Sequence, residues 1–370
     1  MIDFRRKAPE SFTCEPPVTE YSRNVSSIDV AVSHLSDSDC GRWDEFVNAC
    51  PEATFFHRAG WKRAIESSLG HSCFYLLAQR NGEIAGVLPL VHVRSRLFGN
   101  ALISTAFCVQ GGPLARDDGT RAVLERHAIE LAEHVDADYI ELRGTHTPGD
   151  QWHRRADLYV SFRRPIDQDL EKAMLAIPRK QRAMIRKGAK LGLQGEIDHE
   201  VDRFYDVYAT SQRNLGTPVL AKRYFQSLKD VFAEDCEITT ITGNGRPVSS
   251  VLSFYFRDTV LPYYGGGTLH ARAVAANDFM YWEVMRRAHT RHSLWFDFGR
   301  SKVNTGSFAF KKNWGFEPVP LTYSYYLRHL RHLPDINPTN PKYQTFIWLW
   351  KRLPVPVSKV IGPVIARGIG

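Results

Sequence analysis

The sequence lacks the residue patterns that mark common catalytic and metal-binding motifs. Its six cysteines are scattered singly, with no CxxC pair and no cysteine–histidine cluster at zinc spacing, which excludes a zinc module and a disulfide framework. There is no GxSxG, HExxH or GxxxxGK[ST] segment, so a hydrolase elbow, a zinc protease and a P-loop are excluded as well. We therefore expect no bound metal or cofactor and no covalent enzyme intermediate.

Long apolar runs are also absent. No window approaches the roughly 18 consecutive apolar residues of a membrane-spanning helix, and the first residues, MIDFRRKAPESFTCEPP, contain no apolar core of a signal peptide. We expect a cytoplasmic protein, and the scattered cysteines agree with a reducing compartment. The net charge of +8 favours an anionic partner such as a phosphate, a nucleotide, a nucleic acid or a lipid surface.

The strongest pattern that is present is an internal repeat of elements. Each half reads as helix, strand, Asn-Gly turn, returning strand, glycine-marked strand end, helix and buried strand. This order predicts an α/β (α+β) fold of two similar domains, each a mixed, mostly antiparallel sheet flanked by helices. The alternative is one large α+β domain with accidental similarity. The expected divisions are a flexible lead-in at 1–27, domains at 28–165 and 166–335, and an amphipathic tail at 336–370.

A short basic helix is expected at 177–193, in the segment IPRKQRAMIRKGAKLGL. Arg182 and Arg186 are four residues apart, which places both guanidinium groups on one helical face where they can hold one diphosphate. Lys187 adds a third cation beside them. The alternative interpretation is a solvated basic helix without a ligand.

Tyr263, Tyr264, Gly265 and Gly266 begin a glycine-rich strand end in the second half. Consecutive glycines weaken a strand and permit close backbone approach. We expect a donor molecule to lie here, with the tyrosines either in the core or on the pocket wall.

A buried strand in the segment 296–318 delivers Asp297, and Gly299 predicts a sharp turn that presents Arg300, Ser301 and Lys302 at the sheet end. Asp297 is a candidate proton acceptor for an amine. Its alternative role is an ion pair with Arg300.

The segments DFGRSK and FKKNWGFEP, together with the basic R-x-x-x-R helix, resemble the FemAB group of the GNAT superfamily. The closest branch is the one associated with exosortase/PEP-CTERM and exopolysaccharide systems. The resemblance spans the second half and is weaker in the first, where TFFHRAGW carries it. It implies a catalytic Lys311 near the reacting carbonyl and Phe310 at the donor, with Lys312 raising the alternative of a surface lysine.

The same resemblance implies that Arg182, Arg186, Lys187, Arg300 and Lys302 meet the phosphates of a lipid- or nucleotide-linked glycan precursor. Users of acetyl-coenzyme A usually carry a [QR]-x-x-G-x-[GA] loop, where this chain has TLHARAVAANDFMYWE. The donor therefore stays open between aminoacyl-tRNA and acyl-coenzyme A. The expected function is an acyl- or aminoacyl-transferase that forms an amide on an amine of a cell-envelope or exopolysaccharide precursor. The alternative is a non-catalytic scaffold of polysaccharide or PEP-CTERM protein assembly.

The tail combines Trp348 and Trp350 with Lys351, Arg352 and aliphatic residues. This composition is typical of a segment that lies on a membrane surface, here the inner face of the cytoplasmic membrane. Prolines at 354, 356 and 363 exclude one continuous helix. The alternative is a tail that packs back on the protein.

Overall fold

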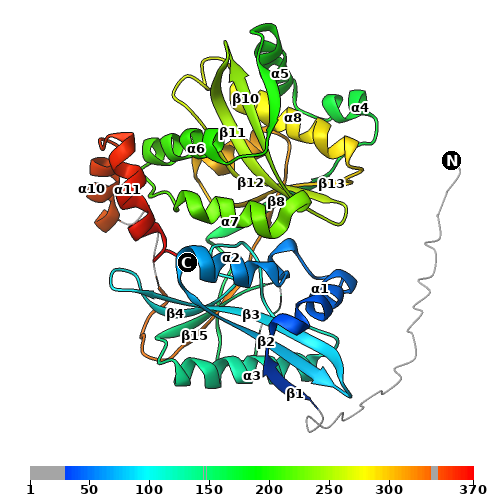
Figure 1. The fold of residues 1–370 in the computed structure, drawn as a ribbon, viewed down its shortest axis with the longest axis vertical. Coiled ribbons are helices and arrows are strands. Elements are labelled where there is room, and N and C mark those ends of the chain that lie inside the picture. Colours follow the sequence, from blue (N-terminus) through cyan, green and yellow to red (C-terminus); the bar gives the residue numbers. More distant parts are fainter. Residues whose placement is uncertain (1–29, 145, 147, 335–340) are drawn as a thin grey trace, which may run out of the picture.

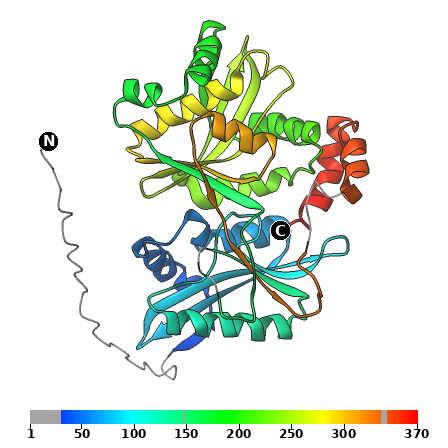
Figure 2. The same ribbon diagram turned by 180° about the vertical axis from the view of Figure 1, so that it is seen from behind.

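Two β-sheets, one above the other, form the framework of the protein (Figures 1 and 2). The computed structural model describes residues 30–144, 146, 148–334 and 341–370, with only the backbone at 341–343. The expected lead-in at 1–27 lies outside these residues. Helices α2 (Gly60–Leu69) and α7 (Lys222–Phe232) pack against each other between the two sheets. The expected fold of two mostly antiparallel sheets flanked by helices is confirmed.

The first sheet has eight strands within the described residues, in the order β1-β2-β3-β4-β6-β15-β7, with β5 paired to β3. Its pairs are antiparallel except for the parallel pair of β4 with β6. The strands are β1 (Ala31–His34), β2 (Ser72–Arg80), β3 (Glu83–Ser95), β4 (Gly99–Ser104), β5 (Leu114–Ala115), β6 (Tyr139–Arg143), β7 (His153–Arg155) and β15 (Tyr323–Leu327).

The second sheet has seven strands in the described part of the chain, in the order β14-β8-β13-β12-β11-β10-β9. Only β12 and β13 run parallel, as β4 and β6 do in the first sheet. The strands are β8 (Tyr159–Pro165), β9 (Gln194–Asp198), β10 (Cys236–Gly243), β11 (Arg246–Phe256), β12 (Thr259–Gly267), β13 (Trp295–Lys302) and β14 (Pro318–Pro320).

Helices flank both sheets. The 17-residue helix α3 covers the outer face of the first sheet, and α5, α6 and α8 pack around the second (Figure 1). The remaining bounds are α1 (Cys40–Ala49), α3 (Asp118–His134), α4 (Leu170–Leu175), α5 (Arg179–Lys190), α6 (Asp202–Leu215), α8 (Ala276–Thr290), α9 (Gly306–Asn313), α10 (Pro341–Trp350) and α11 (Val355–Ala366). Among the described residues, every helix is too short or too polar to cross a lipid bilayer.

The two expected Asn-Gly turns begin equivalent hairpins in the two sheets. Asn81 and Gly82 have φ values of 54° and 81°, and Asn244 and Gly245 have values of 50° and 72°. Two successive positive φ angles are those of the tight hairpin turn for which Asn-Gly is the preferred sequence. The turns join β2 to β3 and β10 to β11.

The two halves exchange strands. The expected domains, 28–165 and 166–335, were continuous segments without such an exchange. Strand β8, inside the segment 28–165, pairs with β13 of the second sheet. Strand β15, inside 166–335, pairs with β6 and β7 of the first sheet. The chain leaves the second sheet after β14 and enters the first at β15. The exchange supplies β6 with the neighbour that it lacks locally.

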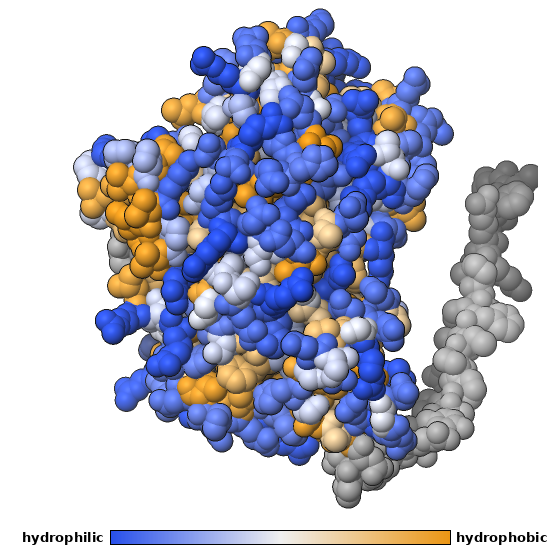
Figure 3. Space-filling model, in the orientation of Figure 1, coloured by the Kyte–Doolittle hydropathy of each residue, from blue (hydrophilic) through white to orange (hydrophobic). Residues whose placement is uncertain are grey.

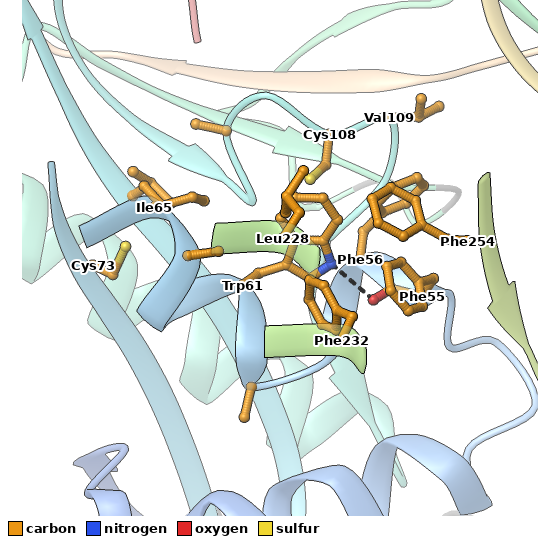
Figure 4. Packing of buried hydrophobic residues seen from close by; sticks show 14 of the residues in the cluster. Phe55, Phe56, Trp61, Ile65, Cys73, Cys108, Val109, Leu228, Phe232 and Phe254 are labelled. Atoms are coloured by element: carbon orange, nitrogen blue, oxygen red, sulfur yellow. Dashed lines mark hydrogen bonds between the residues drawn. The ribbon is translucent and has the colours of Figure 1, made fainter. Parts of the chain in front are cut away.

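A shared apolar core joins the halves (Figure 4). Phe55, in the 3-10 helix η3 (Phe55–His57), is fully buried. Its ring centroid lies 4.5 Å from that of Phe254 on β11 and 4.6 Å from that of Phe232 on α7. Trp61 donates a hydrogen bond to the Phe55 carbonyl oxygen at 3.0 Å. Aromatic side chains from both halves thus interlock in one cluster.

The tail forms two helices that pack on the rest of the protein. Helix α11 packs against α6, and a Cβ atom on Gly362 would lie 3.0 Å from the backbone of Val219. The carbonyl oxygen of Arg367 lies 2.7 Å from Nε2 of His71 in the first half. The tail therefore packs back on the protein, as the alternative interpretation expected. One face of the tail stays exposed.

Candidate active site

The second sheet opens between β12 and β13. These parallel strands pair only at Val260 with Phe296 and one residue earlier on each strand, as far as the structure describes them. Beyond this point β12 continues to Gly267 and β13 to Lys302. Backbone groups that lose their partner across a ladder need other hydrogen bonds. The opening therefore leaves a strand edge at which side chains or a ligand can bind.

A bulge in β13 lies at this opening. The pairing of β13 with β8 shifts register between Asp297 and Arg300, and Gly299 has a φ of 65°. Positive φ is accessible to glycine without a steric penalty. The expected sharp turn at the strand end is therefore wrong in detail, because Arg300 and Lys302 continue the strand opposite β8.

The Lys311 side chain reaches the bulge from α9. Its Nζ donates hydrogen bonds to the carbonyl oxygens of Phe298, Gly299 and Arg300 at 2.7, 3.1 and 3.0 Å. These three acceptors engage all three N–H donors of an ammonium group. Burial lowers the pKa of Lys311 to about 7, although the Asp297 carboxylate opposes this shift. Lys312 is exposed, so Lys311 is the one of the two lysines that faces inward.

Asp297 is half-buried at the base of the same bulge. Its Oδ1 accepts a hydrogen bond from the backbone N–H of Gly299 at 2.7 Å and a longer one from the hydroxyl of Ser161 at 3.5 Å. Burial raises the pKa of the Asp297 carboxyl, while the Gly299 hydrogen bond and the charges of Arg163 and Lys311 oppose this shift. The alternative of an ion pair with Arg300 is wrong. Arg300 instead contacts two tyrosines, as described below.

Phe310 belongs to an aromatic cluster beside the opening. Its ring centroid lies 5.6 Å from that of Tyr281 on α8 and 6.1 Å from that of Trp314. Phe298 of β13 joins the cluster at 4.8 Å from Tyr281. The cluster fixes α9 against the sheet, and with it the position of Lys311.

The two tyrosines of β12 point to different partners. Tyr263 donates a hydrogen bond to the Phe107 carbonyl oxygen of the first half at 3.1 Å. The hydroxyl groups of Tyr264 and Tyr224 are 2.9 Å apart inside the second half. Both side chains thus hold packed parts of the protein together.

The strand-end glycines are approached closely by the protein's own side chains. A Cβ atom on Gly266 would lie 2.6 Å from Cβ of Ser211 on α6, and one on Gly265 would lie 3.2 Å from the hydroxyl of Tyr281 on α8. We expected a donor molecule to approach the backbone of these glycines closely. In the structure, side chains of α6 and α8 occupy that position. A contribution of Gly265 and Gly266 to donor binding stays a prediction.

The cations of α5 make no hydrogen bond or ion pair with Asp297, Gly299 or Lys311 in the part of the chain that the structure describes. Arg186 and Lys187 are exposed and Arg182 is half-buried. None of the three has an ion-pair partner in the described part of the chain. Helix α5 packs on the first turns of α8, where a Cβ atom on Gly188 would lie 2.9 Å from Phe279, and it stands at the end of the second half remote from the first (Figure 1).

Arg300 and Lys302 line a cavity of ≈ 680 Å³ between the two halves. The guanidinium of Arg300 lies 4.4 Å from the ring centroid of Tyr159 and donates to the hydroxyl of Tyr323 at 2.8 Å. Lys311 and the α5 cations lie outside this lining, among the residues that the structure describes. The predicted site residues thus divide into a bulge, a cavity and a remote basic helix.

Sequence reasoning missed Arg143, which also lines the cavity. Its Nε donates to Oε1 of Glu141 at 2.6 Å, and its Nη1 donates to the carbonyl oxygen of Cys108 at 2.7 Å. The available signal was a charged pair, Glu-x-Arg, inside the otherwise apolar strand β6. Charged residues are rarely buried unless they are paired.

No group of three or more metal-ligating side chains lies together in the described ranges. Tyr264 is buried and Tyr263 is half-buried, and their hydroxyl groups make hydrogen bonds to neutral groups. The groups in the site region that carry charge are therefore carboxylate, ammonium and guanidinium groups.

Comparisons with known proteins agree with this geometry. No curated protein matches the sequence. The chain resembles the crystal structure of FemX with a TM-score of 0.64 and 15% identity, over 86% of this chain and 100% of that one.

Two further structures are similar. One is the C-terminal domain of a putative lysylphosphatidylglycerol synthetase from Agrobacterium fabrum, with a TM-score of 0.54 and 12% identity over 79% of this chain and 92% of that one. The other is a tandem GNAT protein from the clavulanic acid biosynthesis pathway, with a TM-score of 0.52 and 12% identity over 80% and 98%. These likenesses show a shared fold. Residues 179–312, which contain α5, the opening and Lys311, match the model of the acetyltransferase (GNAT) domain.

Proposed function

We propose that the protein is an N-acyltransferase that forms an amide by direct transfer of an acyl or aminoacyl group. The acceptor is an amine of a cell-envelope or exopolysaccharide precursor, in the pathway class of exosortase/PEP-CTERM systems, at the inner face of the cytoplasmic membrane. The observation that carries the proposal is the opening between β12 and β13, with the half-buried Lys311 at its edge. It lies within the segment that matches the GNAT domain.

The reaction forms one bond and breaks another. The acceptor nitrogen bonds to the donor carbonyl carbon, and the carbonyl oxygen gains negative charge. The carbon–sulfur bond of a thioester, or the carbon–oxygen bond of an aminoacyl ester, then breaks. The leaving thiol or ribose hydroxyl takes up the proton that the amine loses.

Two residues of the bulge are suited to these steps. Lys311 can stabilise the negative oxygen if it exchanges one of its three carbonyl acceptors for it, and the longest of the three contacts, at 3.1 Å to Gly299, is the weakest. Asp297, whose carboxyl pKa is raised by burial, is a better proton acceptor than an ordinary aspartate. A purely structural Lys311 would keep all three contacts.

The position of α5 supports a contact with donor phosphates rather than with the acceptor. Helix α5 packs on the first turns of α8, and α8 begins without a side-chain cap. Uncapped N–H groups and nearby arginines both favour phosphate. Arg182, Arg186 and Lys187 would thus bind the phosphates of coenzyme A or of tRNA, while Arg300 and Lys302 face the acceptor.

Donor binding is the first test. The protein is titrated calorimetrically with coenzyme A, acetyl-coenzyme A and a long-chain acyl-coenzyme A, at low and at physiological salt. Saturable binding that survives physiological salt identifies a thioester donor, since screening weakens purely electrostatic contacts. Absence of binding directs the titration to charged tRNA, and failure there as well would contradict the proposal.

Lys311→Ala is then compared with Lys312→Ala in single-turnover transfer to a model amine. Lys312 is the matched control because it is adjacent and exposed. We expect roughly 100-fold slower transfer only in Lys311→Ala, with donor affinity unchanged, as for other residues that stabilise an oxyanion. Equal rates in a folded Lys311→Ala protein would exclude Lys311 from the transfer step, whereas no transfer by the wild type with either donor would favour the scaffold interpretation.

A further inference from the structure

Four cations line the cavity between the halves, namely Arg143, Arg155, Arg300 and Lys302. Arg143 pairs with Glu141 at 2.6 Å and Arg155 with Asp157 at 3.4 Å, but no carboxylate lies within ion-pair distance of Arg300 in the part of the chain that the structure describes. The guanidinium of Arg300 is half-buried and stays charged, and partial burial of a charge is costly without an anion. Arg300 therefore fits an anionic group of a ligand.

The cavity lining also includes apolar side chains, several of them from the tail. Ile103 of β4 lines the cavity together with Ile347, Ile365 and Ile369. The tail fits closely here, because a Cβ atom on Gly216 would lie 2.5 Å from Cγ2 of Ile347. A volume of ≈ 680 Å³ is in the range of small-molecule sites. A cavity lined by both cations and apolar side chains suits a molecule with an anionic end and an apolar chain.

Two exposed leucines lie at the edge of the cavity. Leu97, at the tip of the β3–β4 hairpin, lines the cavity and is 74% exposed. Leu215, at the end of α6, also lines it and is 64% exposed. These two side chains form an apolar rim, although the exposed Thr217 and Ser307 line the cavity as well.

This apolar rim continues onto the tail. Trp348, Leu349, Val360 and Val364 are exposed on α10 and α11, with Val360 at 74%. Figure 3 shows apolar side chains gathered over these helices, and Figures 1 and 2 place the hairpin tip on the same side of the molecule. Single exposed apolar residues are ordinary, but a gathered patch is typical of an interaction surface.

Cations accompany the apolar surface. Arg94 and Arg96 are exposed on the hairpin, and Lys351 and Arg352 on the tail. The guanidinium of Arg352 lies 3.6 Å from the ring centroid of Trp348. Tryptophan beside cations and aliphatic residues suits the interface of an anionic bilayer.

We propose that the cavity binds an anionic amphiphile, with a phosphate at Arg300 and an apolar chain along the tail, and that the amphiphile enters from an anionic bilayer on which α10 and α11 lie. This inference rests on the proposed function, for which it defines the acceptor as a lipid-linked phosphate. The tail is then both a wall of the site and its contact with the membrane.

Ligand chemistry is tested by calorimetry with decyl phosphate, inorganic phosphate and decanol, each below its aggregation limit. Decyl phosphate is expected to bind saturably. Inorganic phosphate lacks the apolar chain and decanol lacks the phosphate, so each should bind at least roughly tenfold more weakly. Arg300→Gln should lower the affinity for decyl phosphate roughly tenfold. Arg163→Gln, a control outside the cavity lining, should leave the affinity unchanged. Lys302→Gln serves if Arg300→Gln does not fold. Equal affinity for inorganic phosphate, or unchanged binding in both variants, overturns the proposal.

Membrane contact is tested by co-sedimentation with phosphatidylglycerol–phosphatidylcholine vesicles and with pure phosphatidylcholine vesicles. Val360→Glu should lower binding to the anionic vesicles roughly tenfold, whereas Leu175→Glu on α4, where Leu175 is 64% exposed against 74% for Val360, should not. Wild-type binding by Val360→Glu, or no preference for anionic vesicles, overturns entry from a bilayer. Neither assay needs a donor or turnover, so a failure of the transferase proposal at Lys311 would leave these results unaffected.

Discussion

Replacing Lys311 with methionine removes a half-buried titrating group and nearly preserves the length of the side chain. Burial lowers the pKa of Lys311 to about 7, from the ordinary value of 10.5. Between these two pH values the unfolded chain holds a proton that the folded protein releases. The free energy of unfolding of the wild type therefore rises with pH across this window. The gain is lost as pH falls from 10.5 to 7, and below 7 the contribution of Lys311 no longer changes with pH.

The size of the effect follows from the width of the window. Each pH unit contributes about 1.4 kcal/mol, so the wild type should gain roughly 3–5 kcal/mol relative to Lys311→Met between pH 7 and 10.5. The variant also loses three hydrogen bonds to backbone carbonyls, which lowers its stability by an amount that does not depend on pH. Only the slope of the difference reports the titration.

The assay is urea unfolding of both proteins at half-unit steps of pH, followed by tryptophan fluorescence. Lys312→Met is the control, because an exposed lysine should give a difference that is constant with pH. Parallel stability curves for the wild type and Lys311→Met would refute the reasoning, since they would mean that Lys311 keeps its ordinary pKa in the folded protein.

Three further predictions concern packing and charge. Phe55→Ala should lower the free energy of unfolding by about 3–5 kcal/mol and shift one common calorimetric transition, because Phe55 packs against both halves; two separate transitions would contradict this. The double variant Arg182→Ala/Arg186→Ala should reduce the salt dependence of tRNA binding, with a slope lower by about 0.7–0.9 for each lost phosphate contact; an unchanged slope would exclude α5 from the contact. Gly266→Val should cost about 1–3 kcal/mol in urea unfolding, since its Cβ would meet Ser211; an undiminished midpoint would show that α6 adapts.

Local features of the fold could be predicted from the sequence, because neighbouring residues determine them. The Asn-Gly turns after β2 and β10 need only two residues that accept positive φ. The bulge was predicted only in part, as Gly299 indicates positive φ but not whether the strand ends or continues. The sequence left open whether Lys311 or Lys312 faces inward. The packing of α9 against the sheet determines that it is Lys311.

The exchange of strands and the cavity could not be predicted from local patterns. Strand pairing depends on contacts between residues far apart in the chain, and β15 pairs with β6 and β7, which precede it by more than 160 residues. Arg300 was singled out for its position after Gly299, but its partners Tyr159 and Tyr323 come from two other strands. The tail's share in the cavity wall likewise depends on how α11 docks on α6.

The strand exchange has a consequence for how the chain folds during synthesis. Strand β15 follows every strand of the second sheet in the sequence but completes the first. The N-terminal half therefore emerges from the ribosome with the edge of β6 unpaired, and it stays so until residue 327 has been made. An unpaired edge is prone to aggregation, so a fragment that ends near residue 165 should need chaperones, whereas co-expression with the remaining chain should rescue it.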